Sequence, residues 1–315
     1  MYEKVKFDFE LYNKFSDYLS NKYGGKTYKL PLNVAGTCPN KDGKLGFEGC
    51  VFCGEESAGF ESLSTELKVH EQIKWTADLV SRKYGAKHFI AYFQNWSGTY
   101  RSIESLEQLV REACGVSSTE VVAVYIATRP DCVGDECLKL LKRLKDELEV
   151  DIVLELGLQT VNENALKILN RGHGVAEFVD AVTRIHANDL EVCAHMIIGL
   201  PFDEMEDVIE GAKLLSRLGV VQVKCHSLFV LENTKLGSMY QEGKFVMISK
   251  DEFIERIITF LSYLSPNITL QRLLGRAAEG KALFCNWDMS WWKLRDEIEA
   301  VMRERGVRQG CLIWE

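Results

Sequence analysis

Three of the chain's ten cysteines lie in one glycine-rich loop, at Cys38, Cys50 and Cys53. Their spacing is Cys-x11-Cys-x2-Cys. A two-residue spacer lets a tight turn direct both sulfurs at one metal centre, and Gly49 and Gly54 beside the pair supply the backbone freedom that such a turn needs. We therefore expect these thiolates to bind a metal centre.

The number of ligands limits which centre this is. A structural zinc ion normally takes four ligands in two spaced pairs, and no further Cys or His follows Cys53 at such a spacing, because His70 lies far beyond it in a helical pattern. A [4Fe–4S] cluster also ordinarily takes four thiolates. With three, one iron stays open to bind another ligand, and that iron would be the functional feature. A zinc protein, or an iron–sulfur protein without radical chemistry, stays open as an alternative.

The composition is that of a globular protein with a well-filled core, since 46% of the 315 residues are hydrophobic and 27% are charged. The net charge of −8 gives no overall basic footprint for nucleic acid. The chain has no uncharged apolar stretch of about 18 residues, and its N-terminus does not resemble a secretory signal. We expect a cytoplasmic protein with no membrane contact. In that reducing compartment a disulfide is disfavoured, and the seven scattered cysteines are expected to be small buried residues.

The elements that position the cysteine loop are short apolar strands that alternate with amphipathic helices. Strands are predicted at Thr27–Val34, His88–Gln94, Val121–Thr128, Ile152–Gln159, Glu191–Ile198 and Val220–Phe229. Helices are predicted at Thr65–Arg82, Ile103–Cys114, Cys132–Leu148, Val175–Asn188 and Glu204–Leu218. This alternation predicts an α/β fold built as a partial parallel (β/α)6 barrel, with a doubly wound sheet as the alternative. Both folds bind ligands at the carboxyl ends of their strands, where the cysteine loop lies.

Three segments are predicted: an N-terminal helical segment (1–26), the partial barrel (27–230) and a small C-terminal extension over the barrel mouth (231–315). Within the extension we expect a helix at Lys250–Leu264, a strand at Ile268–Leu273 and a helix at Trp291–Arg305. Residues 266–310 are mildly basic and contain three tryptophans. Such a segment can hold RNA phosphates and stacked bases, but an amphipathic cap with tryptophans in its core fits equally well.

The cysteine loop resembles that of radical S-adenosylmethionine (SAM) enzymes, whose signature ends in Cys-x-aromatic-Cys. The long first gap is similar to that of the elongator-like branch and of a group of bacterial radical SAM proteins. The resemblance to that group runs through six segments: KLPLNVAGTCPNKDG, AYFQNWSGTY, IATRPDCV, LELGLQTVNENALKILNRGH, HMIIGLPFDE and ERGVRQG. It implies a partial barrel, a [4Fe–4S] cluster on the three cysteines, and SAM at the open iron. Reductive cleavage of SAM would give a 5′-deoxyadenosyl radical that abstracts a hydrogen atom.

The resemblance also implies roles for single residues. Phe52 would shield the cluster or pack against a ligand. Gln159 and Arg171 match residues that bind SAM in oxygen-independent coproporphyrinogen oxidases, Arg171 through the SAM carboxylate. His195 stands where those enzymes carry an aspartate that contacts SAM, and Gly199 would shape the adenine pocket. From the residues alone, Arg171 also fits a charge at a helix C-terminus, and His195 a core histidine.

The implied partners follow from the same relatives. A radical SAM enzyme needs an electron donor of the flavodoxin or ferredoxin type. Relatives of the elongator-like branch process the side chain of the wobble uridine of tRNA, which favours tRNA as the substrate. A small metabolite, as in the coproporphyrinogen enzymes, is the alternative. No catalytic residue is assigned from the sequence.

Overall fold

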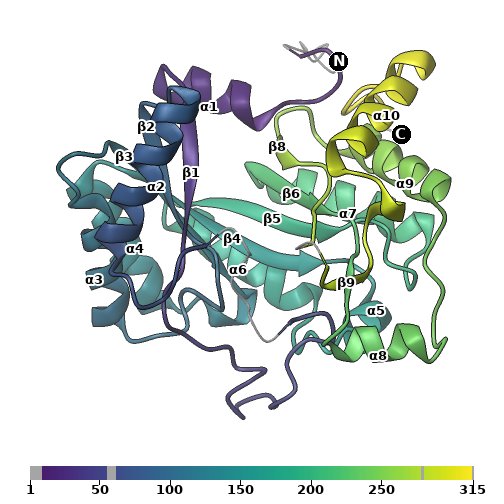
Figure 1. Ribbon diagram of the computed structural model, residues 1–315, viewed down its shortest axis with the longest axis horizontal. Helices are drawn as coiled ribbons and strands as arrows, with labels where there is room; N and C mark the ends of the chain where they lie inside the picture. The colour runs from purple at the N-terminus through teal and green to yellow at the C-terminus, as the bar shows by residue number, and fades with distance from the viewer. Residues whose placement is uncertain (1–8, 55–61, 278–279, 314–315) are drawn as a thin grey trace.

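The computed structural model describes residues 9–54, 62–277 and 280–313. Within them the chain forms a half-barrel of parallel strands with helices on its outer face (Figure 1). The strands are β1 (Thr27–Leu32), β2 (His88–Phe93), β3 (Val121–Thr128), β4 (Asp151–Gln159), β5 (Glu191–Ile197), β6 (Gln222–His226) and β8 (Thr269–Arg272). Their order in the sheet is β1-β2-β3-β4-β5-β6-β8, the order of the chain. In a doubly wound sheet the order of the strands reverses at the centre of the sheet. The order seen here does not reverse, so the partial barrel is confirmed.

The seventh strand extends the predicted barrel. β8 lies within Ile268–Leu273, a stretch that the sequence analysis assigned to the C-terminal extension, and it pairs in parallel with β6. The predicted extension therefore contributes a strand to the main sheet in addition to packing on it. The limits of the three predicted segments stay predictions, and residues 1–8 of the first lie outside the described residues.

The crossover helices pack on the outer face of the sheet and form the main hydrophobic core with it. They are α2 (Val69–Tyr84), α3 (Ile103–Cys114), α4 (Asp135–Leu148), α6 (Val175–Ala187), α7 (Met205–Leu218) and α9 (Lys250–Tyr263). Leu138, Leu141 and Leu144 of α4 are fully buried, as their helical spacing predicts. The helix predicted from Cys132 begins at Asp135, because the turn η1 (Pro130–Cys132) and the N-cap Gly134 come first. Two short helices, α5 (Glu163–Ile168) and α8 (Lys235–Gln241), were not predicted.

The N-terminal helix α1 (Phe15–Tyr23) closes the barrel at the amino-terminal end of its strands. Leu19 packs inside the lumen with Tyr125 of β3. The hydroxyl of Tyr23 donates to Asp151, the first residue of β4, at 2.6 Å. Helix α1 therefore occupies this end of the lumen, and the cavity described below lies at the carboxyl ends of the strands.

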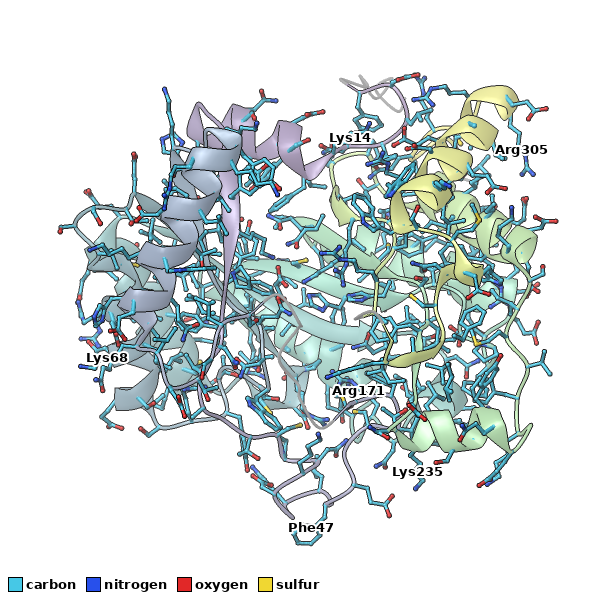
Figure 2. All side chains as sticks on the ribbon, viewed as in Figure 1. Lys14, Phe47, Lys68, Arg171, Lys235 and Arg305 are labelled. Atoms are coloured by element: carbon cyan, nitrogen blue, oxygen red, sulfur yellow. The ribbon has the colours of Figure 1, made fainter. Side chains whose placement is uncertain are left out.

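The remaining C-terminal elements are the small antiparallel sheet of β7 (Val230–Leu231) and β9 (Ala282–Phe284), the turn η2 (Asn286–Asp288) and helix α10 (Trp291–Arg305). Figure 2 shows Arg305 of α10 and Phe47 of the cysteine loop at opposite ends of the molecule. Arg303 and Arg305 form ion pairs with Glu10 and Glu255. Helix α10 therefore packs away from the cysteine loop, with two of its arginines paired. No helix among the described residues has both the length and the apolar character needed to cross a membrane.

Candidate functional site

The cysteine loop after β1 is held in shape by its own backbone. The carbonyl of Cys38 accepts hydrogen bonds from the N–H groups of Lys41 and Asp42, at 2.8 and 3.2 Å. Cys53 N–H donates to the Cys50 carbonyl at 3.0 Å, which makes the tight turn expected of the two-residue spacer. Gly49, just before this turn, has φ +71°, a conformation that favours glycine.

The loop docks on the segment that follows α5, more than a hundred residues away in the chain. Val51 N–H donates to the Leu169 carbonyl at 3.0 Å. The side chain of Asn170 donates to the Gly49 carbonyl, and that of Asn40 donates to the Asn170 carbonyl, each at 2.7 Å. Two of the segments that carry the family resemblance are therefore in contact. The segment that contains Leu169 and Asn170 holds the cysteine loop in position.

A cavity of about 280 Å³ opens at the carboxyl ends of the strands. It brings together seven of the eight predicted site residues: Cys38, Cys50, Phe52, Cys53, Gln159, Arg171 and His195. Gly199 is the exception, because it does not line the cavity. It has φ +101°, and an added Cβ would lie 2.9 Å from the ring of Phe253 in α9. Gly199 thus allows close packing of α9, and its contribution to SAM binding stays a prediction.

Arg171 bridges the cysteine loop and the sheet, and Figure 2 shows it above the loop. Its Nη1 donates to Cys50 Sγ at 3.5 Å and its Nη2 to the Gly157 carbonyl at 2.8 Å. Its Nε is buried and has no hydrogen-bond partner among the described residues. A buried cationic donor without an acceptor is costly unless a ligand completes it, which fits the predicted role of Arg171 better than a solvated charge at a helix end.

The charges around Cys50 favour metal binding. A hydrogen bond from Cys53 holds the pKa of the Cys50 thiol well below its usual value, and the nearby guanidinium groups of Arg171 and Arg129 act in the same direction. The thiolate is the form that binds metals. Three thiol groups on one cavity, beside a buried cation with a free donor, fit a [4Fe–4S] cluster and an anionic ligand at its open iron. Cys38, Cys50 and Cys53 would hold the cluster, and Arg171 would face the SAM carboxylate.

Strand β4 contributes a row of alternating residues to the cavity: Glu155, Gly157 and Gln159. A bulge between Gly157 and Gln159 shifts the register with β5, and Gln159 has φ +78°. Such bulges redirect side chains near binding sites. At Gly157 an added Cβ would overlap Nη2 of Arg171, so this position must be glycine for the guanidinium to reach the strand.

The loops after β2 and β3 partly brace the site. After β2, Gln94, Trp96 and Ser97 line the cavity. Asn95 instead holds the end of β1, because its amide donates to the Val34 carbonyl at 2.7 Å. Arg129 pairs with Asp131 at 2.8 Å and donates to the Arg171 carbonyl at 2.7 Å. Arg129 also lines the cavity, so its two contacts connect the loop after β3 to Arg171.

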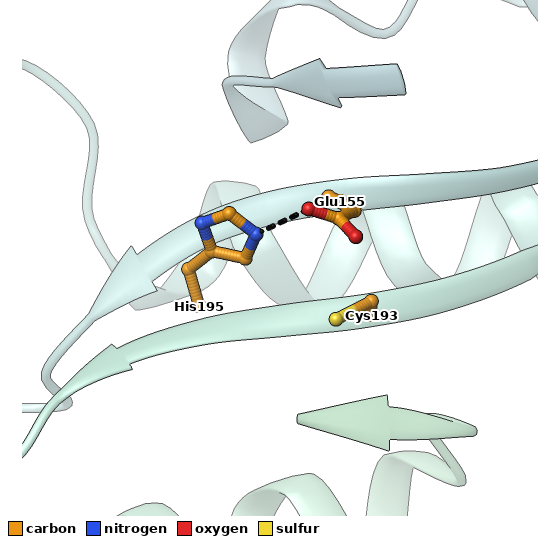
Figure 3. A group of neighbouring side chains, drawn as sticks. All are labelled: Glu155, Cys193 and His195. Atoms are coloured by element: carbon orange, nitrogen blue, oxygen red, sulfur yellow. Dashed lines mark hydrogen bonds and ion pairs between the residues drawn. The ribbon is translucent and has the colours of Figure 1, made fainter. Parts of the chain in front are cut away.

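Several cavity residues were not predicted from the sequence. Lys41 lies over the Trp96 ring at 5.3 Å, and residues 226–229, at and after the end of β6, also line the cavity. Glu155 is buried at the cavity floor and bonds to His195 Nε2 at 2.8 Å, as Figure 3 shows. The signal for Glu155 was an acidic residue inside an apolar strand. The signal for residues 226–229 was their position at the carboxyl end of a predicted strand, where ligands of a parallel barrel bind.

Comparison with known proteins identifies the family of the chain. The model of the radical SAM superfamily matches residues 33–215, and that of the radical SAM C-terminal domain matches residues 220–304. The protein MJ0486 of Methanocaldococcus jannaschii is 31% identical, over 98% of this chain and 97% of that protein. A tRNA uridine(34) acetyltransferase of the same organism is 28% identical, over 61% of this chain and 34% of its own length.

Among solved structures, the archaeal Elp3 of Methanocaldococcus infernus matches with a TM-score of 0.69 at 18% identity, and it shares the fold. The match covers 90% of this chain and 64% of that one, so the chain corresponds to part of a longer protein there. The cysteine loop, the half-barrel and these matches lead to one conclusion. The chain belongs to the radical SAM superfamily and is a radical SAM enzyme that uses a [4Fe–4S] cluster and SAM.

Proposed function

We propose that the chain modifies the wobble uridine of tRNA by radical chemistry. The observation that carries this proposal is the likeness over 61% of the chain to a protein named for its action on tRNA uridine 34. When bound, a cluster on the three cysteines together with SAM would supply the radical that takes a hydrogen atom from the substrate. The chain's own residues bind and orient the ligands and keep water from the radical.

The size of the cavity supports a large substrate of which only one part enters. Its volume of about 280 Å³ lies at the lower end of the usual range for small-molecule sites, roughly 300–1,000 Å³. The cluster and SAM must share this space with the reacting group. A flipped or unpaired base at the end of a large molecule meets this limit, because its sugar, phosphates and neighbours stay outside.

The rim of the cysteine loop supports the same proposal. Phe47 at the loop tip is 79% exposed. Beside the tip, Lys44 lies 5.3 Å from the centre of the Tyr100 ring, and Lys41 lies at the cavity itself. An exposed aromatic ring together with nearby lysines is the combination that stacks bases and neutralises phosphates in single-stranded RNA. The chain is acidic overall, so this rim would act as a local binding surface.

The proposal is tested with the reconstituted enzyme under anaerobic reduction. Bulk tRNA from a strain that lacks the gene serves as substrate, and nucleoside mass spectrometry reads the product. We expect a changed uridine at the wobble position with the wild-type chain and none with Cys50→Ala. Normal cleavage of SAM without any changed nucleoside would refute the tRNA substrate and leave the membership of the superfamily intact.

A further inference from the structure

A buried carboxylate lies in the lumen between the helix α1 and the cavity. Glu155 of β4 is 1% exposed. Its Oε1 accepts hydrogen bonds from the ammonium group of Lys29 and from Gln271 Nε2, the latter at 2.8 Å. Its Oε2 accepts from His195 Nε2 at 2.8 Å and from Lys224 Nζ at 3.3 Å. Four groups from four other strands therefore converge on one carboxylate.

The same residues resemble a metal site, but the charges argue against one. The ligand atoms of Glu155, Cys193 and His195 all lie within 4.8 Å of one another (Figure 3). Lys29 and Lys224 contact the two carboxylate oxygens and so already fill the positions beside them. Burial lowers the pKa of Lys29, and that of Lys224 to about 7, but the charge that remains on them would repel a divalent cation. Burial raises the pKa of the Cys193 thiol well above its usual value, which keeps the thiol protonated. The two lysines occupy the place of the metal ion.

The carboxylate decides the tautomer of His195. An ionised carboxylate only accepts hydrogen bonds, so His195 Nε2 carries the proton. Burial, helped by the charge of Lys224, lowers the pKa of His195 to about 4 and keeps the ring neutral. Nδ1 is then an acceptor. No residue of the described chain donates a hydrogen bond to Nδ1, which Figure 3 shows on the side of the ring away from Glu155.

We propose that Glu155 is a positioning residue, which locks His195 as the Nε2–H tautomer so that Nδ1 accepts a hydrogen bond from a hydroxyl or amino group of the ligand in the cavity. Lys29, Lys224 and Gln271 keep the carboxylate ionised and fixed. His195 lines the cavity and Glu155 forms part of its floor. Partners that orient a ligand-binding histidine act in this way in many sites.

The structure suggests a variant that reverses the tautomer. In Glu155→Gln the carbonyl oxygen takes the place of Oε1, because Lys29 and Gln271 both donate there. The amide nitrogen then faces His195 and donates to Nε2, which moves the ring proton to Nδ1. The same exchange of carboxylate for amide gives the wrong tautomer in serine protease triads. Because Lys224 would also face the amide, we combine Glu155→Gln with Lys224→Met, which removes the carboxylate together with the lysine that donates to its Oε2.

The first readout is independent of activity. Nitrogen-15 NMR of histidine-labelled full-length chain reports the protonation of each ring nitrogen, and His195→Gln assigns the signal. We expect the Nε2–H form in the wild type and in Lys224→Met at pH 8, and the Nδ1–H form in the double variant. Thermal unfolding confirms that the variants fold. A wild-type chain with Nδ1–H at His195, or with mixed tautomers, would overturn the proposal, whether or not the double variant folds.

The second readout tests the ligand. In the reconstituted enzyme, calorimetry measures the affinity for SAM. If the donor belongs to SAM, the double variant binds SAM about tenfold more weakly than Lys224→Met does. If the donor belongs to the substrate, the affinity for SAM is unchanged and the KM for tRNA rises by a similar factor. This second outcome rests on the proposed function. A switched tautomer with neither change would refute the role of Nδ1. A chain that shows the tautomer and SAM results but modifies no tRNA would refute the proposed function alone.

Discussion

Gly157→Ala is the smallest change that should separate cluster binding from SAM binding. The Gly157 carbonyl accepts a hydrogen bond from Arg171 Nη2 at 2.8 Å. The guanidinium can approach this closely because Gly157 has no side chain. An added Cβ would overlap Nη2 and lie 2.8 Å from Gln159 Nε2. Arg171 must therefore withdraw from both Gly157 and Cys50. The three cysteines are untouched, so the cluster should still form.

The magnitude follows from what is displaced. Adding a methyl group to a packed site typically costs about 1–3 kcal/mol of unfolding free energy, and we expect a loss in that range because the displaced groups are side-chain ends. Arg171 would also lose its place opposite the SAM carboxylate. A hydrogen bond to a charged group is worth about 1.5–3 kcal/mol, so the affinity for SAM should fall roughly ten- to a hundredfold.

Three measurements on one preparation decide the outcome: urea unfolding, iron content after reconstitution, and calorimetric titration with SAM. Gly46→Ala is the matched control in the cysteine loop, because its added Cβ meets its nearest neighbour only at 4.0 Å. The control should match the wild type in iron content and SAM affinity. Wild-type SAM affinity in Gly157→Ala would refute the role given to Arg171. Loss of iron in Gly157→Ala would show instead that Arg171 supports the cluster.

The other predictions concern the cluster, the rim and a buried acid. Cys50→Ala should abolish both the cluster and SAM cleavage, whereas Cys193→Ala should leave both in place; iron content and release of 5′-deoxyadenosine measure this. Phe47→Ala should raise the KM for tRNA severalfold at constant SAM cleavage, while Trp75→Ala, another exposed aromatic, should not; equal effects would contradict RNA stacking at the rim. Burial raises the pKa of Asp203 to about 7 from its usual 3.8. Between these pH values the Asp203 carboxyl is more protonated in the folded chain than in the unfolded chain. The free energy of unfolding that Asp203 contributes therefore falls as the pH rises through this window. Urea unfolding should show the stability of Asp203→Asn relative to the wild type increasing from pH 4 to pH 8, and a constant difference would refute this.

The sequence predicted the sheet well because the strands are short apolar runs buried on both faces. Strand Val121–Thr128 and helix Ile103–Cys114 occur at the predicted bounds. The short helix α5 escaped prediction, because six residues show too little of the helical period. The position of α1 in the lumen depends on contacts such as that of Tyr23 with Asp151, and no local pattern encodes them.

The site was partly predictable for a similar reason. Ligands of a parallel barrel gather at the carboxyl ends of its strands, so chain order was enough to bring Cys38, Gln159 and His195 to one cavity. The contacts of Glu155 were not predictable. Lys29 lies 126 residues before it and Lys224 69 residues after it, and their meeting depends on register across the whole half-barrel.

Stability alone does not explain the charges in the lumen. A buried ion pair is expensive to desolvate, and well-packed apolar residues of similar size are often as stable or more so. An apolar lumen would, however, leave His195 free to place its proton on either ring nitrogen. Helix α1 closes the lumen below, so water does not compete for the carboxylate from that side. The role proposed for the lysines and Glu155 is therefore to fix the direction of a hydrogen bond: they make the half-buried His195 an acceptor of fixed orientation in the cavity that the three cysteines also line.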